Sequence, residues 1–448
     1  MIRFNEEFIS QVRDVIQSKD DVQTLELLKD LHPADIAELY QTLNLDEAEY
    51  IYMLLDPETA ADVLSELDDD DRKKLLSHLP NELIAQHFIQ NMDTDDAVDI
   101  IRDLDEDEQE DILSHIHDME QAGDIVDLLK YDVDTAGGLM GTEMIVVNEN
   151  WSMPECIKEM RNQAEEMDEI YYVYVVDDDE RLVGIFPLKS MITSPSVSKV
   201  KKVMTHDPIS VKTDTPIEDV ANDFEKYNLI AMPVVDSIGR LVGRITVDDV
   251  MDKVREINEK DYQLASGLSQ DVESSDTIFT QTTARLPWLI IGMIGGISNS
   301  IILGKFESGF VSNPAIALFI PLIGGTGGNV GIQSSAIVVQ GLANGSLNMK
   351  SASRQILKEC GVGMINASMI SILVFLYNWF RIGNSGITVS VSLSLFAVIM
   401  FASFFGTIVP MTLEKLNIDP AIATGPFITI TNDIIGMLIY MGISSALA

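Results

Sequence analysis

One carboxylate lies in the middle of a long apolar segment near the C-terminus. Asp433 stands between the apolar stretch that begins at Ala421 and the one that ends at Leu447. An ionisable group at the centre of a bilayer costs a few kcal/mol and usually faces water or a partner. No basic residue lies at a similar depth in the other apolar segments. Asp433 therefore predicts a cation site on a path through a membrane.

The residues before Asp433 offer further oxygen ligands. Pro426 has no N–H, so the carbonyl of Ile422 loses its helical donor, and Gly425 lets the backbone approach a ligand. Thr429 precedes Asp433 by one helical turn and presents a carbonyl or a hydroxyl on the same face. Oxygen ligands of this kind suit Mg²⁺, which keeps several of its waters when it binds.

A second apolar segment contains five glycines between Pro321 and Gln333. Small residues in membrane helices usually serve close helix packing, and that explanation would suffice for the glycines alone. Asn329 and Gln333, four residues apart, add two amides to one face of the same helix. The segment therefore predicts a pore lining that includes Gly328 and Asn329.

A row of acids on one predicted helix, Asp248 to Leu268, leads toward the apolar segments. Its members recur every three or four residues: Asp248, Asp252, Glu256 and Glu259. Like charges at this spacing destabilise a helix by about 0.2–0.5 kcal/mol per pair. The row is an ordinary solvated face if neighbouring bases offset the repulsion, and a bound divalent cation would offset it more strongly.

The charge of the chain is divided unequally. There are 71 acidic and 30 basic residues among 448, and the first 285 residues carry a net charge of −42. This excludes nucleic acid as a partner, because phosphate binding requires a basic surface. An acidic surface can serve solubility alone, but it also attracts cations.

Five apolar runs after Arg285 are long enough to cross a bilayer, at about 287–304, 314–342, 359–380, 388–413 and 420–447. With a cytoplasmic N-terminus, the inner flanks and loops hold five basic residues and the outer loops two, which favours that orientation. We expect a multi-pass protein of the cell (inner) membrane, surrounded by lipid, with an extracytoplasmic C-terminus.

An internal repeat precedes the spans. Tyr174-Val-Val-Asp177 and Leu182-Val-Gly-Ile185 recur 59 residues later, and each copy ends at the start of a predicted helix. The repeat resembles a tandem pair of CBS modules, a resemblance that implies a site for ATP or another adenine nucleotide.

The predicted fold is multidomain. An α-helical solenoid covers residues 1–135, and an α/β tandem CBS pair covers 136–255. A connecting helix with its linker covers 248–280, and an α-helical polytopic membrane domain covers 281–448.

Taken together, the chain resembles the MgtE family of magnesium channels. The resemblance rests on the Gly-Thr-Gly-Gly-Asn-Val-Gly-Ile-Gln333 run, the Asp419-Pro-Ala to Asp433 run, Ala284-Arg-Leu-Pro-Trp288, the CBS pair and the acidic helical N-terminus. It implies a homodimer whose ion path is lined by the second and fifth spans, with hydrated Mg²⁺ held by Asp433 and the carbonyl of Thr429.

The resemblance also implies that cytosolic carboxylates sense Mg²⁺ and close the pore. We assign this role to eight acids: Asp96, Glu218, Asp248, Asp249, Asp252, Glu256, Glu259 and Asp261. Two positions depart from the family pattern. Asn228 stands where a sensor Asp is expected, and Gly425 stands where some members have Asn.

The predicted function is a Mg²⁺-selective channel gated by cytosolic Mg²⁺, and not an enzyme. One alternative is a secondary-active divalent-cation transporter, against which the absence of other buried acids in the spans argues. The other is a membrane-tethered sensor of adenylates or Mg²⁺ that conducts nothing, against which the unpaired Asp433 argues.

Overall fold

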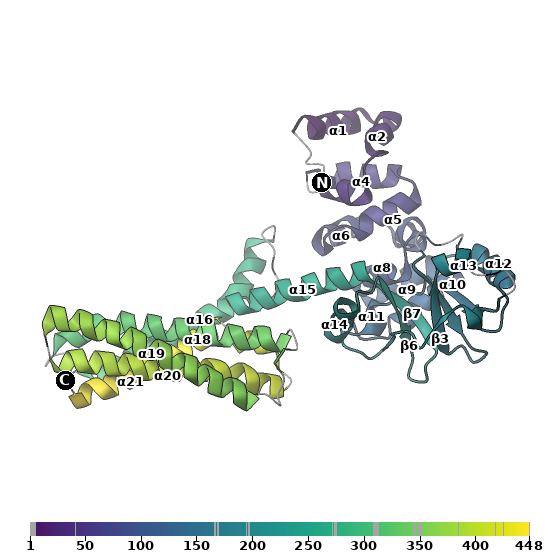
Figure 1. The fold of residues 1–448 in the computed structure, drawn as a ribbon. Coiled ribbons are helices and arrows are strands. Elements are labelled where there is room, and N and C mark those ends of the chain that lie inside the picture. The colour runs from purple at the N-terminus through teal and green to yellow at the C-terminus, as the bar shows by residue number, and fades with distance from the viewer. Residues whose placement is uncertain are drawn as a thin grey trace. The chain divides into compact units, whose positions relative to one another are not determined.

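The structure, a computed structural model, describes residues 6–447 except 41, 165–166, 168–169, 194, 196–197, 271, 273–275, 308–312, 344–345, 348–351, 384, 417 and 424. The chain divides into two compact units, Met1–Val254 and Arg255–Ala448, called here the first unit and the membrane unit. Helix α15 (Val247–Ser266) contains the boundary between them (Figure 1).

The first unit begins with short helices whose apolar faces share one core. Polar residues start several of them. Asn44 and Glu47 form a capping box at α4, and Asp56 accepts a hydrogen bond from Thr59 N ahead of Pro57 in α5. The helices are α1 (Glu6–Ser18), α2 (Asp21–Leu28), α3 (Pro33–Tyr40), α4 (Leu45–Leu54), α5 (Pro57–Ser65), α6 (Asp69–Leu76), α7 (Asn81–Leu83), α8 (Thr94–Arg102), α9 (Glu106–His115), α10 (Met119–Leu128) and α11 (Ala136–Leu139).

The CBS region contains two small sheets with the same internal pattern. In each sheet a strand pairs in parallel with the next, which pairs antiparallel with the third, and a bulge falls near the end of the middle strand. The strands are β1 (Ile145–Asn148), β2 (Tyr172–Val176), β3 (Leu182–Pro187), β4 (Thr205–His206), β5 (Val211–Lys212), β6 (Ala231–Val235) and β7 (Leu241–Thr246). Strands β6 and β7 begin 59 residues after β2 and β3, so the predicted repeat is confirmed.

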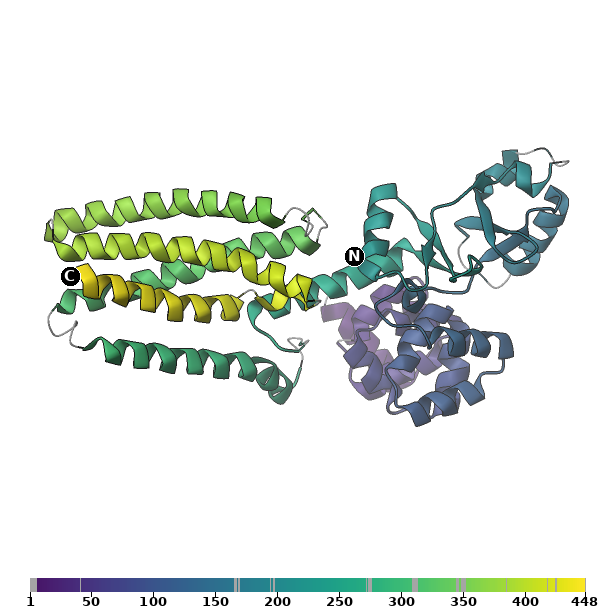
Figure 2. The ribbon, with the colours of Figure 1, turned by 90° about the horizontal axis from the view of Figure 1, so that it is seen from below.

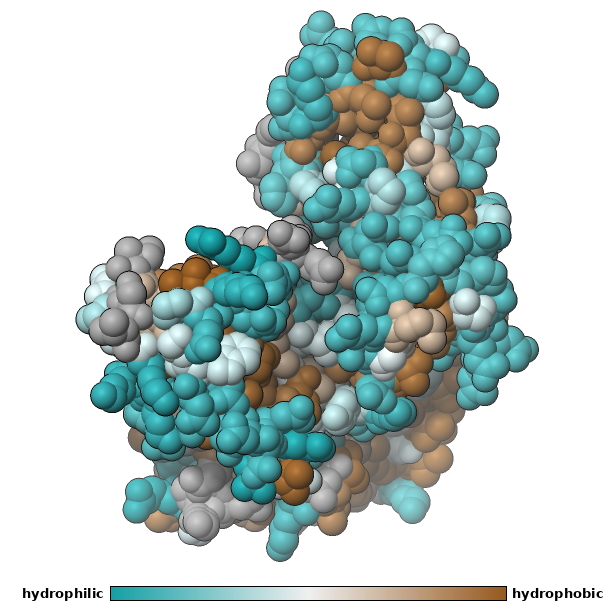
Figure 3. Space-filling model, turned by 90° about the vertical axis from the view of Figure 1, so that its right-hand side faces the viewer, coloured by the Kyte–Doolittle hydropathy of each residue, from teal (hydrophilic) through white to brown (hydrophobic). Residues whose placement is uncertain are grey.

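Three helices accompany the sheets, α12 (Met153–Gln163), α13 (Leu188–Thr193) and α14 (Ile217–Tyr227). Figure 3 looks onto the right-hand side of Figure 1, where most of the visible surface is hydrophilic, as the acidic composition predicts. Helix α15 follows β7 directly and ends before Gly267, whose φ of +84° no helix continues through. The predicted single helix over this stretch is therefore confirmed.

The membrane unit contains five helices that are long and apolar enough to cross a bilayer. They are α16 (Ile278–Lys305), α18 (Ile320–Ala343), α19 (Ala352–Ile382), α20 (Gly386–Lys415) and α21 (Gly425–Leu447). Helix α20 is the most buried and packs against α18, α19 and α21, whereas α16 is the least buried and packs against α21 (Figure 2). The fifth helix begins later than predicted because Pro420–Ala423 form a separate 3-10 turn, η7.

Candidate cation sites

The glycine-rich helix α18 brings its backbone against the carboxylate of Asp433. A Cβ atom at Gly324 would lie 3.3 Å from Asp433 Oδ1, and one at Gly328 would lie 3.9 Å from the same oxygen and 3.3 Å from Thr429 Cγ2. Any larger residue would fill the space beside the carboxylate. The structure therefore brings together three predicted pore residues, Asp433, Thr429 and Gly328.

Other glycines of the same region serve packing instead. A Cβ atom at Gly331 would lie 2.0 Å from Asn432 Nδ2, and one at Gly406 of α20 would lie 2.4 Å from the carbonyl oxygen of Gly331. A side chain at Gly406 would require the backbone of α18 to move, and one at Gly331 would displace the side chains of Asn432 and Ile428. Close packing therefore accounts for Gly331, whereas Gly324 and Gly328 lie beside the carboxylate of Asp433.

Asn329 and Gln333 lie on an exposed stripe of α18, which also includes Gly325. The three residues are spaced by four, so they share one face of the helix. The structure thus places Asn329 at the surface of the single chain and not in the space beside Asp433 that Gly324 and Gly328 border.

Gly425 begins α21 with a φ of +44° and lies against the end of the connecting helix. A Cβ atom there would come within 2.3 Å of the carbonyl oxygen of Ala265 in α15. A Cβ atom at Gly267 would come within 2.5 Å of Pro426 Cγ. This chain therefore has no room for the Asn that some family members carry, and the last turn of α15 touches the first turn of α21.

The expectation that the spans contain no other buried acid is wrong. Glu359 is only 4% exposed and lies in α19. The hydroxyl of Ser403 in α20 donates a hydrogen bond of 3.2 Å to the backbone carbonyl of Glu359. The sequence placed Glu359 at the edge of its span, but the helix begins at Ala352, so Glu359 lies two turns inside it.

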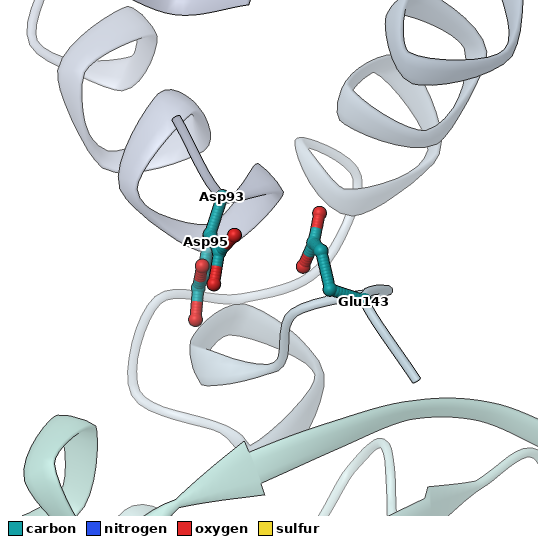
Figure 4. Close-up of side chains that lie close together, drawn as sticks. All are labelled: Asp93, Asp95 and Glu143. Atoms are coloured by element: carbon teal, nitrogen blue, oxygen red, sulfur yellow. The ribbon is translucent and has the colours of Figure 1, made fainter. Parts of the chain in front are cut away.

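In the first unit, three carboxylates converge between the start of α8 and the segment before β1. Oxygens of Asp93, Asp95 and Glu143 lie within 4.8 Å of one another (Figure 4). Thr94 fixes Glu143 by donating from its backbone N–H at 2.9 Å and from its hydroxyl at 3.2 Å. Among the described residues, no other group of three or more acidic, His or Cys side chains is as closely spaced.

Two predicted sensor residues adjoin this acidic group. Loss of hydration and repulsion from Asp249 and Asp96 raise the pKa of Asp95 well above its ordinary range. Loss of hydration, with a contribution from Asp249, raises the pKa of Asp96 to about 6. The pKa of Asp249 is also raised by loss of hydration, although Thr246 N donates to its carboxylate at 3.0 Å. Carboxylates that repel one another in this way are stabilised by a cation.

The other predicted sensor residues are not gathered into a group. Glu218 is exposed in the first turn of α14, and Asp261 is half-buried on α15. The acidic row of α15 is exposed along about 16 Å of helix: Asp248, Asp252, Glu256 and Glu259. Arg255 Nε lies 3.0 Å from a Glu259 oxygen.

The departure at Asn228 falls at the end of a helix. Asn228 ends α14 with a φ of 51°, a left-handed conformation that Asn and Asp both adopt more readily than most residues, so either of the two would fit this position.

Sequence reasoning missed Asp93, Asp95 and Glu143 as a group. Asp93 and Asp95 are two residues apart, but Glu143 is about 50 residues away. Nothing local in the sequence joins them, because the contact depends on how the helical region packs against the CBS region.

A narrow cleft adjoins the same acidic group. Glu143 and Arg244 line it together with Tyr171, Tyr172 and Tyr174. The Arg244 guanidinium lies over the Tyr171 ring at 5.9 Å, and its Nη2 lies 3.5 Å from an Asp93 oxygen. The Tyr174 hydroxyl and Arg244 Nε are buried, and neither has a hydrogen-bond partner among the described residues. Aromatic rings beside an arginine suit a ligand with a flat ring and a phosphate.

The chain has five helices that can cross a membrane, a carboxylate set against a glycine-rich helix, and an acidic first unit. These features are those of a membrane protein that binds cations. A family model described as divalent cation transporter, MgtE, matches residues 320–443. A model of the MgtE intracellular N domain matches residues 31–134. A model of the CBS domain matches twice, at residues 136–195 and 200–256.

The chain is 31% identical to the magnesium transporter MgtE of Thermus thermophilus over 450 residues, 99% of each chain. It is 34% identical to that of Enterococcus faecalis over 442 residues, 98% of this chain and 97% of the relative. The chain belongs to the MgtE family. The predictions of fold class and of family are therefore confirmed, and the predicted function is confirmed as far as magnesium transport.

Two solved structures resemble the first part of the chain. The crystal structure of the soluble part of a magnesium transporter is 30% identical, with a TM-score of 0.52, and covers 56% of this chain and 98% of its own. The cytosolic domain of the Mg²⁺ channel MgtE in complex with ATP is 31% identical, also with a TM-score of 0.52, and covers 55% of this chain and 99% of its own.

Proposed function

We propose that this protein is a homodimeric Mg²⁺ channel of the cell (inner) membrane, with its N-terminus in the cytoplasm, and that cytosolic Mg²⁺ closes it. The observation that carries the proposal is the carboxylate of Asp433, set within a membrane span against the backbone of Gly324 and Gly328. The relatives named magnesium transporters match over nearly the whole chain, which supports Mg²⁺ as the transported ion.

The ion path runs beside α21 and α18. Hydrated Mg²⁺ is held by the Asp433 carboxylate and by a backbone carbonyl at Thr429, while Gly328 leaves room for its waters. The exposed stripe of Gly325, Asn329 and Gln333 lines the path from a second copy of the chain. Such a stripe would be costly against lipid, which supports an assembly of two copies.

Sensing is carried out by the acidic group of the first unit. A cation between Asp93, Asp95 and Glu143 relieves the repulsion that raises the pKa of Asp95, and Asp96 and Asp249 lie beside it. The exposed acids of α14 and α15 supply further ligands in the closed arrangement: Glu218, Asp248, Asp252, Glu256, Glu259 and Asp261. To change the ratio of closed to open channels from 1:99 to 99:1, Mg²⁺ must bind the closed state more strongly than the open state by about 5.5 kcal/mol in total. Several weak sites together can supply this difference.

Helix α15 links sensing to the path. Asp249 accepts the Thr246 N–H at the first turn of α15, and the last turn meets Gly425 and Pro426 at the start of α21. Because the helix is continuous, a cation that fixes its first turn also restrains the residues that begin the pore-lining span.

An adenine nucleotide is the second proposed ligand. The rings of Tyr171, Tyr172 and Tyr174 and the guanidinium of Arg244 line a narrow cleft, which would have to widen to admit the base and a phosphate. A relative's cytosolic domain in complex with ATP supports this assignment.

The test is Mg²⁺ flux into liposomes that contain the purified protein, recorded against internal Mg²⁺. The channel proposal expects flux that needs no proton or sodium gradient and that stops when internal Mg²⁺ is high. Flux that requires such a gradient would instead establish a secondary-active transporter, for which the buried Glu359 is the observation in favour. Glu359→Gln, assayed with and without a proton gradient, tests that alternative directly.

A further inference from the structure

Helix α16 faces the rest of the membrane unit along one narrow stripe. From Ala284 onward, residues that are not exposed recur at three- or four-residue spacing, with Ser298 and Leu303 beside them: Ala284, Trp288, Gly292, Gly295, Asn299 and Ile302. Ile430 of α21 contacts this stripe, because a Cβ atom at Gly295 would lie 2.4 Å from Ile430 Cγ2 and one at Gly292 would lie 3.9 Å from Ile430 Cδ1. Asn299 follows Gly295 by one turn on the same face.

The register brings Asn299 to the level of Asp433. Helices α16 and α21 are the first and fifth of five spans, so they run in the same direction, as Figure 2 shows. One turn beyond Gly295 on α16 lies Asn299, and one turn beyond Ile430 on α21 lie Asp433 and Ile434. Asn299, four residues beyond Gly295, thus lies within about one residue's rise of Asp433, three residues beyond Ile430, and is close in height to the carboxylate of the proposed ion site.

The amide of Asn299 has an unused acceptor. Its Oδ1 atom is buried and has no hydrogen-bond partner among the described residues. The neighbouring Ser298, in contrast, donates to the carbonyl of Ile294 at 2.8 Å. A buried acceptor without a partner is unfavourable, and more so in a membrane, unless a water or a ligand completes it.

We infer that Asn299 is an ion-binding residue of the path, which accepts a hydrogen bond from a water in the shell of the Mg²⁺ at Asp433. The waters of bound Mg²⁺ are strong donors, and Mg²⁺ gives them up reluctantly. An amide oxygen one shell away from the ion suits them better than a second carboxylate, which would hold the ion too firmly to let it pass. This inference rests on the proposed function, because it needs a hydrated cation at Asp433.

The test compares Asn299→Ala and Asn299→Asp with Ser298→Ala, a matched control whose hydroxyl bonds only within its own helix. Loss of one charge-assisted hydrogen bond is expected to raise the half-saturating external Mg²⁺ about tenfold in Asn299→Ala, with the maximal flux changed less. Asn299→Asp keeps the acceptor, so it should restore or lower the half-saturating concentration. Ser298→Ala should match the wild type.

The outcomes separate this inference from the proposed function. If Asp433→Asn abolishes flux but Asn299→Ala keeps the wild-type half-saturation, the channel stands and the role of Asn299 is refuted. The inference is also refuted if Asn299→Ala raises the half-saturating Mg²⁺, Asn299→Asp does not reverse this rise, and the melting temperature of the dimer changes. Asn299 would then be a packing residue. If Asp433→Asn conducts normally, the proposed function itself fails.

Discussion

The two units of the chain hold carboxylates in opposite ways. In the membrane unit, Asp433 is a single carboxylate set against the glycines Gly324 and Gly328, and in the first unit, Asp93, Asp95 and Glu143 crowd together with Asp96 and Asp249 next to them. A single carboxylate with open space can bind a hydrated ion weakly and release it. A group of mutually repelling carboxylates binds a cation more strongly and changes its own packing when it does so. The difference suits the roles proposed above, ion passage in the membrane unit and Mg²⁺ sensing in the first unit.

The largest expected effect is at Asp433. Asp433→Asn should lower Mg²⁺ flux about hundredfold or more, because the substitution removes the charge that attracts the ion while keeping the shape of the side chain. Flux into liposomes measures it, with gel filtration as the check on folding. Wild-type flux from a correctly inserted variant would end the comparison, since the membrane carboxylate would then have no role in permeation.

Removing the acids of α15 should affect gating and not permeation. We expect the combined change of Asp249, Asp252, Glu256 and Glu259 to Ala to raise the internal Mg²⁺ needed for half-closure about tenfold, because ligands used only in the closed state are lost. Open probability against internal Mg²⁺ is the measurement. A variant that stays closed at every concentration would mean that these acids act by repulsion alone.

The packing glycines can be separated from those beside the ion site. Gly331→Ala should destabilise the membrane unit by about 1–3 kcal/mol, because the new methyl group would overlap Asn432 and Ile428. Gly361→Ala is the matched control, since a Cβ atom there meets nothing within 4 Å. Thermal unfolding in detergent compares the two, and equal stability would show that α18 and α21 are not held as closely as described.

The smallest expected effect concerns pH. In the first unit Asp96 has a folded pKa of about 6, and Asp95 and Asp249 also have raised values, against about 3.9 for an unfolded Asp. Raised values mean that the folded state binds protons more readily, so without Mg²⁺ the stability should increase as pH falls from 7.5 toward 4. After allowance for solvent screening of Asp96, we expect the free energy of unfolding to increase by about 1 kcal/mol over this pH range. This corresponds to a rise of roughly 2–4 °C in melting temperature.

The same protons compete with the metal. Mg²⁺ should raise the melting temperature at pH 7.5 and much less at pH 5, whereas monovalent salt at matched ionic strength should give little of this rise. Melting curves at the two pH values with and without Mg²⁺ provide the measurement. If sodium chloride raised the melting temperature equally, the effect of Mg²⁺ would be general charge screening and not binding at the acidic group.

The sequence predicted the parts of the molecule that depend on local pattern. The five spans, the 59-residue repeat and the single helix from Asp248 follow from apolar length, repetition and charge spacing. Glu359 was misjudged because the apolar run is shorter than the helix that contains it. The different roles of Gly328 and Gly331 could not be predicted, since both are glycines of one run and only the opposite helix distinguishes them.

Helix α15 has 20 residues without a break and is therefore about 30 Å long. A rod of this kind fixes the angular phase between its ends as well as their separation. One residue inserted in its middle would turn everything beyond it by about 100° relative to the residues before it. Seven inserted residues, close to two full turns, would restore the phase while lengthening the rod by about 10 Å. The response of the pore to the first unit should therefore vary with the number of inserted residues with the period of the α-helix, about 3.6 residues. A flexible tether would show no such period.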